Sequence, residues 1–155
     1  MSKKKPDRGL RITNRKARFN FELLERFEAG ICLQGTEVKS LRSGQASLEE
    51  AYARFQGSEL YLINCHIKPY EHGNIMNHEP LRPRKLLLRR REIRKLATRV
   101  TQRGLTLVPL QIYFSKRGLA KVELALARGK AAHDKREQIK KRDQEREIRA
   151  ALKRR

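Results

Sequence analysis

Several residue types that would point to particular protein classes are missing or scarce in this sequence. Tryptophan is absent, and only five phenylalanines and four tyrosines occur among 155 residues. The two cysteines, Cys32 and Cys65, form no CxxC motif, which argues against a disulfide scaffold and for a reducing cytosol. No apolar run approaches the roughly 20 residues that span a bilayer, and no signal-peptide core follows the basic start.

Acidic residues are also few, and the positive charge that remains is unevenly distributed. The chain has 38 Lys and Arg against 17 Asp and Glu, a net charge of +21. Basic residues dominate 1–18, 82–103 and 128–155, whereas 19–81 carries nine acidic against five basic residues. Such an excess predicts a polyanionic partner, because neutralising phosphates releases condensed counterions. An anionic membrane surface is the other candidate.

Alternating apolar residues predict short strands in the first part of the chain. A strand is expected over residues 19–27, with an irregularity at Leu24. Gly30 is then expected to turn the chain into a second strand at 31–33. Thr36 can cap a short helix that follows.

Residues 47–55 are compatible with two structures. Ser47 and Glu50 fit the capping box of a helix. The alternation up to residue 55, followed by Gly57 and the apolar run 60–63, fits a β-hairpin instead. The hairpin is favoured and the helix remains the alternative.

The second half of the chain has clearer periodicity. Prolines and polar residues predict a long loop over 69–84. The spacing of Ile93, Leu96, Ala97 and Val100 predicts an amphipathic helix over 89–102 with a buried apolar stripe. Alternation over 108–114 and 122–126 predicts a second hairpin. The fold class is mainly β with α: six antiparallel strands in a barrel-like arrangement, with two or three short helices.

Three segments are expected along the chain: a flexible basic arm at 1–13, a domain at 14–128 and a basic tail at 129–155. In the tail, Glu137 precedes Lys141 by four residues, which favours a helix. Its few large apolar side chains are too little to offset about 1–2 kcal/mol of backbone entropy per residue. We expect the tail to be disordered when free and helical in an anionic groove. A plain charged tail is the alternative.

The helix expected at 89–102 carries a dense cationic face. Arg90 and Arg94, and Arg91 and Lys95, stack four residues apart, at a cost of roughly 0.2–0.5 kcal/mol per pair. This arrangement indicates either a phosphate-binding surface or a solvated cationic face. Tyr61, Tyr70 and Tyr113 could also stack on bases, although core packing is the better explanation for most of them.

Motifs for catalysis and metal binding are not found. The sequence has no P-loop, GxSxG or HExxH motif, and the adjacent Glu49 and Glu50 make a poor acid–base pair. The spacing of Cys65, His66 and two later histidines matches no standard zinc site. We therefore expect no enzymatic activity, no metal and no cofactor.

Four segments resemble one known family, the SsrA-binding (small protein B) family. They are 35–42 (GTEVKSLR), 84–88 (RKLLL), 104–110 (GLTLVPL) and 127–136 (ARGKAAHDKR). The resemblance runs collinearly from about Asn14 to the C-terminus.

This resemblance implies an oligonucleotide-binding-like barrel that binds the tRNA-like domain of transfer-messenger RNA (SsrA RNA). It also implies delivery of that RNA to stalled ribosomes, with elongation factor Tu and GTP contacted through the aminoacylated RNA. The tail would fold as a helix in the decoding centre and the empty mRNA channel. The implied protein is a cytoplasmic monomer without a membrane partner. A structural ribosomal protein that binds ribosomal RNA is the alternative function.

Charge and resemblance together select two sets of candidate residues. The RNA-binding candidates are Asn14, Arg18, Glu28, Lys39, Lys85, Leu87, Arg89, Arg90, Arg91, Arg94 and Lys95. The ribosome-contacting candidates in the tail are Gly129, Lys130, His133, Asp134, Lys135, Arg136, Lys140, Lys141 and Arg142. Phe19, Thr36 and Arg89 differ from residues found in part of the family.

Overall fold

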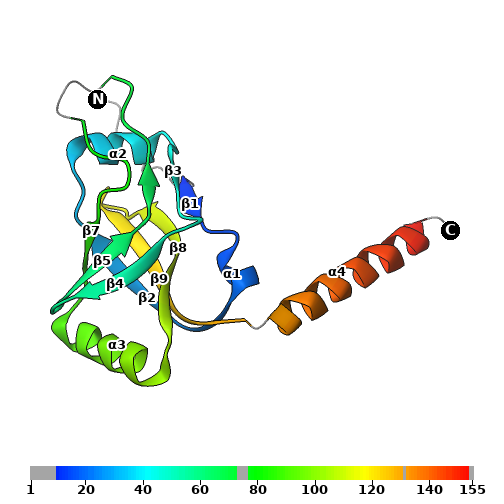
Figure 1. Ribbon diagram of the computed structural model, residues 1–155. Coiled ribbons are helices and arrows are strands. Elements are labelled where there is room, and N and C mark those ends of the chain that lie inside the picture. Colours follow the sequence, from blue (N-terminus) through cyan, green and yellow to red (C-terminus); the bar gives the residue numbers. More distant parts are fainter. Residues whose placement is uncertain (1–9, 73–76, 131, 154–155) are drawn as a thin grey trace.

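The computed structural model describes residues 10–72, 77–130 and 132–153 (Figure 1). The side chains of 102–103, 132–138, 141 and 153 lie outside the described part. The elements are β1 (Arg11–Thr13), α1 (Ala17–Asn20), β2 (Phe21–Ile31), α2 (Gly35–Arg42), β3 (Ala46–Ser47), β4 (Tyr52–Gln56), β5 (Glu59–Ile63), β6 (His66–Ile67), β7 (Arg84–Leu87), α3 (Arg90–Arg103), β8 (Thr106–Phe114), β9 (Ala120–Gly129) and α4 (Ala132–Lys153).

Six antiparallel strands close into a ring. The strand order is β1-β8-β4-β5-β7-β2-β9, and β9 pairs back onto β8, which leaves β1 as a seventh strand beside β8. A separate two-stranded sheet joins β3 and β6. The prediction of a mainly β fold with a few helices is confirmed. Strand β1 takes up residues 11–13, which belong to the arm expected at 1–13, and residues 1–9 lie outside the described part.

Strand β2 is longer than predicted and does not end at Gly30. The irregularity expected at Leu24 is confirmed by a register shift between Leu23 and Glu25 against β9. The predicted turn at Gly30 and strand at 31–33 are wrong, because Gly30 pairs with Leu87 of β7 and also with β9. A Cβ at Gly30 would lie 3.3 Å from the Cβ of Leu87. The glycine therefore permits close strand packing and not a turn.

Helix α2 is present but begins differently from the prediction. Gln34 is its N-cap, and the Gln34 backbone N–H donates to the Glu37 carboxylate at 2.7 Å, as in a capping box. The prediction that Thr36 caps the helix is wrong. The Thr36 hydroxyl lies 2.8 Å from Nδ1 of His78 instead, which links α2 to the loop before β7.

The two predicted hairpins are confirmed. Strands β4 and β5 pair around Gly57, whose φ is +62°, so the helix considered for 47–55 is not formed. The long β8–β9 hairpin supplies a large part of the ring. The short strands β3, β6 and β7 were not predicted, because two to four residues are too few to show a period.

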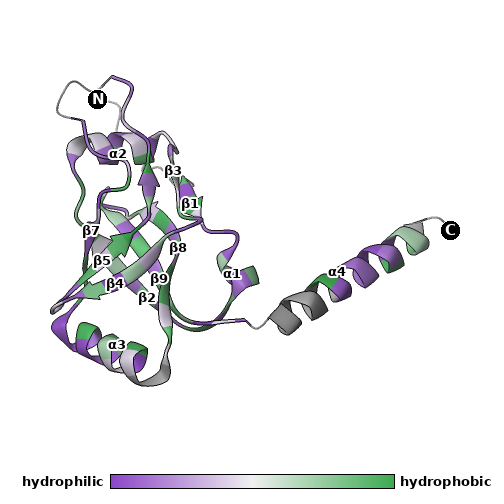
Figure 2. Cartoon of the chain, viewed as in Figure 1, coloured by the Kyte–Doolittle hydropathy of each residue, from purple (hydrophilic) through white to green (hydrophobic). Residues whose placement is uncertain are grey.

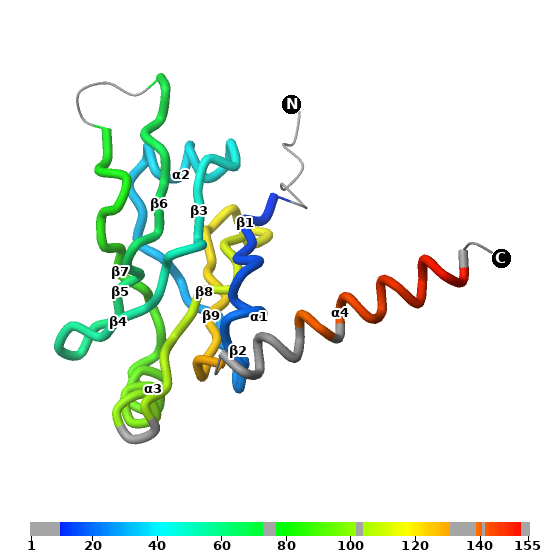
Figure 3. Tube along the Cα trace, turned by 45° about the vertical axis from the view of Figure 1, so that its right-hand side comes forward, coloured from blue at the N-terminus to red at the C-terminus, as the bar shows by residue number. Residues whose placement is uncertain are grey.

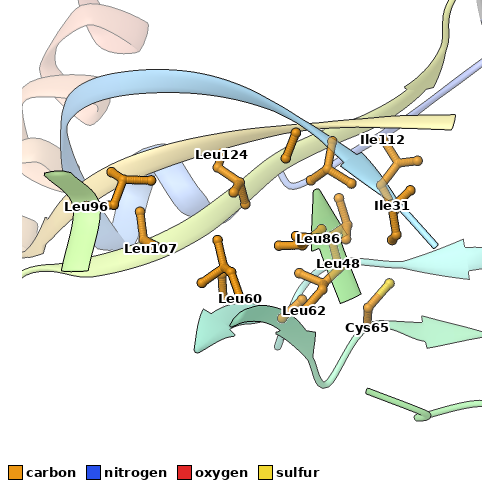
Figure 4. Packing of buried hydrophobic residues seen from close by; sticks show 14 of the residues in the cluster. Ile31, Leu48, Leu60, Leu62, Cys65, Leu86, Leu96, Leu107, Ile112 and Leu124 are labelled. Atoms are coloured by element: carbon orange, nitrogen blue, oxygen red, sulfur yellow. The ribbon is translucent and has the colours of Figure 1, made fainter. Parts of the chain in front are cut away.

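Apolar side chains fill the inside of the ring (Figure 4). Leu60, Leu62 and Leu124 are fully buried there, and Leu96 of α3 closes one end. Helices α2 and α3 lie at opposite ends of the ring in both Figure 1 and Figure 3. The predicted helix at 89–102 is thus confirmed as α3, and its core contacts position its basic face outside the ring.

Helix α4 extends away from the ring (Figures 1 and 3). Its surface is mainly hydrophilic (Figure 2), and Ile139, Ile148 and Leu152 are exposed. The Lys130 backbone N–H donates to the Asn20 carbonyl at 3.1 Å just before the helix. No helix in the described ranges has both the length and the apolar character needed to cross a membrane.

Candidate nucleic-acid interface

A buried ion-pair cluster fixes the segments that carry several candidate residues. Arg84 and Glu37 are both fully buried, and the Arg84 Nε donates to the Glu37 carboxylate. Arg84 Nη1 also donates to the Cys65 carbonyl at 2.6 Å, and Arg82 Nη2 donates to Glu37 at 2.5 Å. Burial alone would raise the pKa of Glu37, but the hydrogen bonds from Arg82, Gln34 and Arg84 outweigh it and lower the pKa below 4.5. The cluster joins α2 to β7, and so sets the path that leads into α3.

Asn14 lines a cleft of about 520 Å³, which we call the Asn14 cleft. Its side-chain amide donates to the Pro109 carbonyl at 3.0 Å, and its backbone N–H donates to the Leu110 carbonyl at 2.8 Å. Strand β8 shifts register between Pro109 and Gln111, so Asn14 holds this irregularity in place. Asn14 is only 5% exposed, and its Oδ1 has no hydrogen-bond partner among the described residues.

The walls of the Asn14 cleft are mainly cationic. They are formed by Arg11, Thr13, Arg15, Arg18, Arg26, Leu110, Gln111 and Glu123. Glu123 accepts from Gln111 at 2.5 Å and lies 3.4 Å from Arg26. Within the described ranges, Arg11, Arg15 and Arg18 form no ion pair. Uncompensated guanidinium groups around a cleft form a site suited to phosphate oxygens.

Glu28 is held by Tyr113 on the same side of the ring. The Tyr113 hydroxyl donates to the Glu28 carboxylate. Burial, together with this hydrogen bond, raises the pKa of Tyr113 to about 12. Glu28 also pairs across the strands with Glu123, a like-charged neighbour. The Glu28 carboxylate is therefore held in place by a hydrogen bond within the protein, and its role in nucleic-acid binding stays a prediction.

The cationic face of α3 is divided into two parts. Lys95 Nζ lies 3.6 Å from Glu25, and Arg99 also pairs with that carboxylate. In contrast, the side chains of Arg89, Arg90, Arg91 and Arg94 are exposed and form no ion pair with described residues. Three of these arginines lie at or beside the N-terminus of the helix, where the macrodipole disfavours cations. This costly placement favours the phosphate-binding interpretation over a merely solvated face.

The remaining candidates on the body lie in different surroundings. Lys85 Nζ donates to Glu59 at 2.9 Å, and this hydrogen bond raises the pKa of Lys85. Leu87 is 49% exposed beside Gly30. The ammonium of Lys39 lies 5.4 Å from the ring centroid of Tyr70. None of these residues lines the Asn14 cleft or joins the free arginines of α3.

The first two candidate residues of the tail, Gly129 and Lys130, are in contact with the body. Gly129 is the last residue of β9 and pairs with Phe21, and Lys130 Nζ donates to the Arg18 carbonyl at 2.9 Å. Arg142 lies 5.9 Å from the Phe19 ring centroid, and Lys140 is exposed. His133, Asp134, Lys135, Arg136 and Lys141 have backbones in α4, and their side chains lie outside the described part.

Groups suited to metal or nucleophilic chemistry are not gathered in the described ranges. No cluster of three or more His, Cys, Asp or Glu residues that could hold a metal ion occurs there. Burial raises the pKa of Cys65 to about 11, which keeps this thiol protonated and poorly nucleophilic.

Sequence reasoning missed several residues of these surfaces. Arg11, Arg15 and Arg26 line the Asn14 cleft, and Glu123 organises part of its wall. The basic block at 1–18 was the available signal for the first two arginines. Nothing in the linear pattern indicated that β1, α1, β8 and β9 would meet around one cleft.

The fold and these surfaces define a small, strongly basic protein with a ring of six strands and exposed arginines that suit a polyanion. The sequence profile of the SmpB protein family matches residues 11–154, and the chain belongs to this family. It is 59% identical to an SsrA-binding protein of Sphingopyxis alaskensis over 90% of this chain and 87% of the relative. The SsrA-binding protein of Moorella thermoacetica is 56% identical, over 92% of each chain.

A solved structure has the same fold. It is described as "tmRNA-SmpB: a journey to the center of the bacterial ribosome", and its chain is 56% identical with a TM-score of 0.67. The match covers 80% of this chain and 87% of that chain.

Proposed function

We propose that this protein binds the tRNA-like domain of transfer-messenger RNA and delivers it to stalled ribosomes for trans-translation. The observation that carries the proposal is the identity of 56–59% to SsrA-binding proteins over about nine-tenths of the chain. Arginines of the Asn14 cleft and of α3 that form no ion pair with described residues supply the charge that such a partner requires.

The body and the tail have separate tasks in this proposal. The body, residues 14–128, is an oligonucleotide-binding-like barrel that holds the tRNA-like domain. The tail, residues 129–155, is disordered when free and becomes helical in the decoding centre and the empty mRNA channel. The exposure of Ile139, Ile148 and Leu152 in α4 supports this division, because ordering the tail needs an external surface.

The protein acts without catalysis, cofactor or metal. It functions as a monomer in the cytoplasm and contacts elongation factor Tu and GTP indirectly, through the aminoacylated RNA. The two free cysteines are compatible with a reducing compartment.

Removal of residues 129–155 separates the two tasks. We expect the truncated protein to bind a transcript of the tRNA-like domain with nearly unchanged affinity and to lose peptide tagging on stalled ribosomes. Gel-shift and reconstituted tagging assays measure the two properties. Loss of RNA binding on truncation would contradict the division. Retention of the protein on translating ribosomes through a high-salt wash would favour a structural ribosomal protein.

The salt dependence of binding tests the α3 surface. Alanine at Arg90, Arg91 or Arg94 should flatten the slope of log K against log salt by about one unit per lost phosphate contact. Lys95→Ala should change the slope less, because Lys95 already pairs with Glu25. Unchanged slopes for all three arginines would identify α3 as a solvated face.

A further inference from the structure

A groove of about 410 Å³ lies between α3 and the β4–β5 turn. The proposed function uses two arginines of its wall, Arg90 and Arg94, but gives the groove itself no task. One wall is the turn at 57–58, and the other is the face of α3 that carries Arg90, Ile93, Arg94 and Ala97. We call this feature the α3 groove. Its volume falls within the range of about 300–1,000 Å³ that is typical of sites for a small molecule.

The floor of the α3 groove is apolar and incompletely covered. The predicted apolar stripe of α3 comprised Ile93, Leu96, Ala97 and Val100. Leu96 is fully buried in the core and Val100 packs against it, whereas Ile93 and Ala97 are half-buried and belong to neither hydrophobic cluster. The prediction that the whole stripe is buried is therefore wrong for these two residues. Phe55 joins them from β4, so the groove offers apolar surface beyond what the core needs.

The groove is bordered by positive charge. Arg90 and Arg94 are four residues apart on α3, line the groove and form no ion pair with described residues. A guanidinium plane can both stack on a nucleobase and donate to phosphate oxygens. An apolar floor beside two such groups matches a nucleotide, whose base is flat and apolar on its faces and whose phosphates are anionic.

We infer that the α3 groove binds one unstacked nucleotide of single-stranded RNA, with its base on Ile93 and Ala97 and its flanking phosphates on Arg90 and Arg94. This inference rests on the proposed RNA-binding function and names a new subsite for it. The base must be unpaired, because a base within an A-form duplex is stacked and cannot enter a pocket. Charge complementarity favours RNA over a peptide, since the net charge is +21 and both bordering side chains are cationic.

The test fills the groove without changing its charge. The full-length protein is titrated into a fluorescent single-stranded octaribonucleotide that contains 4-thiouridine. Ala97→Phe should weaken binding by roughly five- to a hundredfold, as expected for one lost stacked base, and should leave the salt slope unchanged. The matched control is Thr98→Phe, which adds the same side chain at a neighbouring exposed position outside the groove and should bind like the wild type.

Irradiation then reports the position of the base. We expect crosslinks from 4-thiouridine to the α3 groove in the wild-type protein, and their loss in Ala97→Phe. If Ala97→Phe does not fold, as judged by its urea midpoint, a pair of double variants replaces it. Arg90→Ala with Arg94→Ala should abolish the groove crosslink. Lys116→Ala with Arg117→Ala removes the same charge at the exposed β8–β9 turn, outside the groove, and should retain the groove crosslink.

Several outcomes would overturn the inference. One is that Ala97→Phe and Thr98→Phe bind the octamer equally well. Another is that crosslinks form only with other parts of the body. A third is that an RNA duplex of the same length competes as well as single-stranded RNA. If an acidic aromatic peptide displaces the octamer, and if its own binding is lost in Ala97→Phe, the groove binds a protein partner instead. Binding of a tRNA-like domain transcript by the wild type is measured in parallel. If the transcript does not bind, the proposed function is contradicted. If the transcript binds but Ala97→Phe does not weaken binding of the octamer, only the inference about the groove is contradicted.

Discussion

Glu37 and Arg84 are completely buried partners, and their charges stabilise the fold only as a pair. Glu37→Gln would leave the Arg84 guanidinium buried without a counter-charge. We expect a loss of about 3–5 kcal/mol in the free energy of unfolding, measured by urea denaturation. Glu59→Gln is the matched control, because Glu59 pairs with Lys85 at the half-exposed surface and its loss should shift the midpoint far less.

Glu37 should also make the stability of the protein depend on pH. The pKa of Glu37 is lower in the folded protein than its ordinary value of 4.5. Its contribution to stability is therefore complete above about pH 4.5 and is lost as the pH falls through the lowered value. Glu37→Gln should unfold with a weaker dependence on pH below this point than the wild type. Identical acid profiles for the two proteins would contradict the assignment.

Tyr113 and Glu28 offer a second test at the level of residues. Because burial and the hydrogen bond to Glu28 raise the pKa of Tyr113 to about 12, Glu28→Gln should lower that pKa toward 10. Ultraviolet titration of tyrosinate measures the change. Tyr113→Phe should weaken RNA binding to the same degree as Glu28→Gln if the carboxylate acts through this network. A loss confined to Glu28→Gln would indicate that the carboxylate contacts RNA directly.

At the scale of the element, the arginines at the start of α3 favour RNA binding but lower the stability of the helix. Arginines at its N-terminus oppose the helix dipole, so Arg91→Glu should stabilise the protein by roughly 0.3–1 kcal/mol. The same change should weaken RNA binding by removing a cation and adding an anion. Thermal unfolding and RNA titration measure the opposite effects. Thr101→Glu, near the other end of α3, is the control and should give no stabilisation.

At the scale of the whole molecule, stability should be concentrated in the ring. Strands β2, β8 and β9 pair with neighbours on both sides and enclose the core, whereas α4 extends away from it. Native-state hydrogen exchange should show the slowest amides in these strands and the fastest in the tail. Addition of the RNA partner should slow exchange on the cationic surfaces of the body. Slow exchange throughout the tail of the free protein would contradict the proposed coupling of its folding to ribosome binding.

Local pattern determined much of this protein. The hairpins at β4–β5 and β8–β9, the irregularity at Leu24 and helix α3 were all predicted from periodicity, because each element is long enough to show a period of two or 3.6 residues. Charge distribution likewise identified the basic face of α3. The family resemblance, carried by contiguous segments, predicted the family that the comparisons then showed.

Tertiary structure alone decided the features that depend on neighbours distant in sequence. Gly30 continues β2 because β7 and β9 hold it on both sides, although glycine by itself favours a turn. Glu37 is buried because it pairs with Arg84, which lies 47 residues away in the sequence. Ile93 stays half-buried because it lines the α3 groove beside the β4–β5 turn instead of packing into the core. Ring closure brings these segments together, and no local propensity encodes which segments will meet.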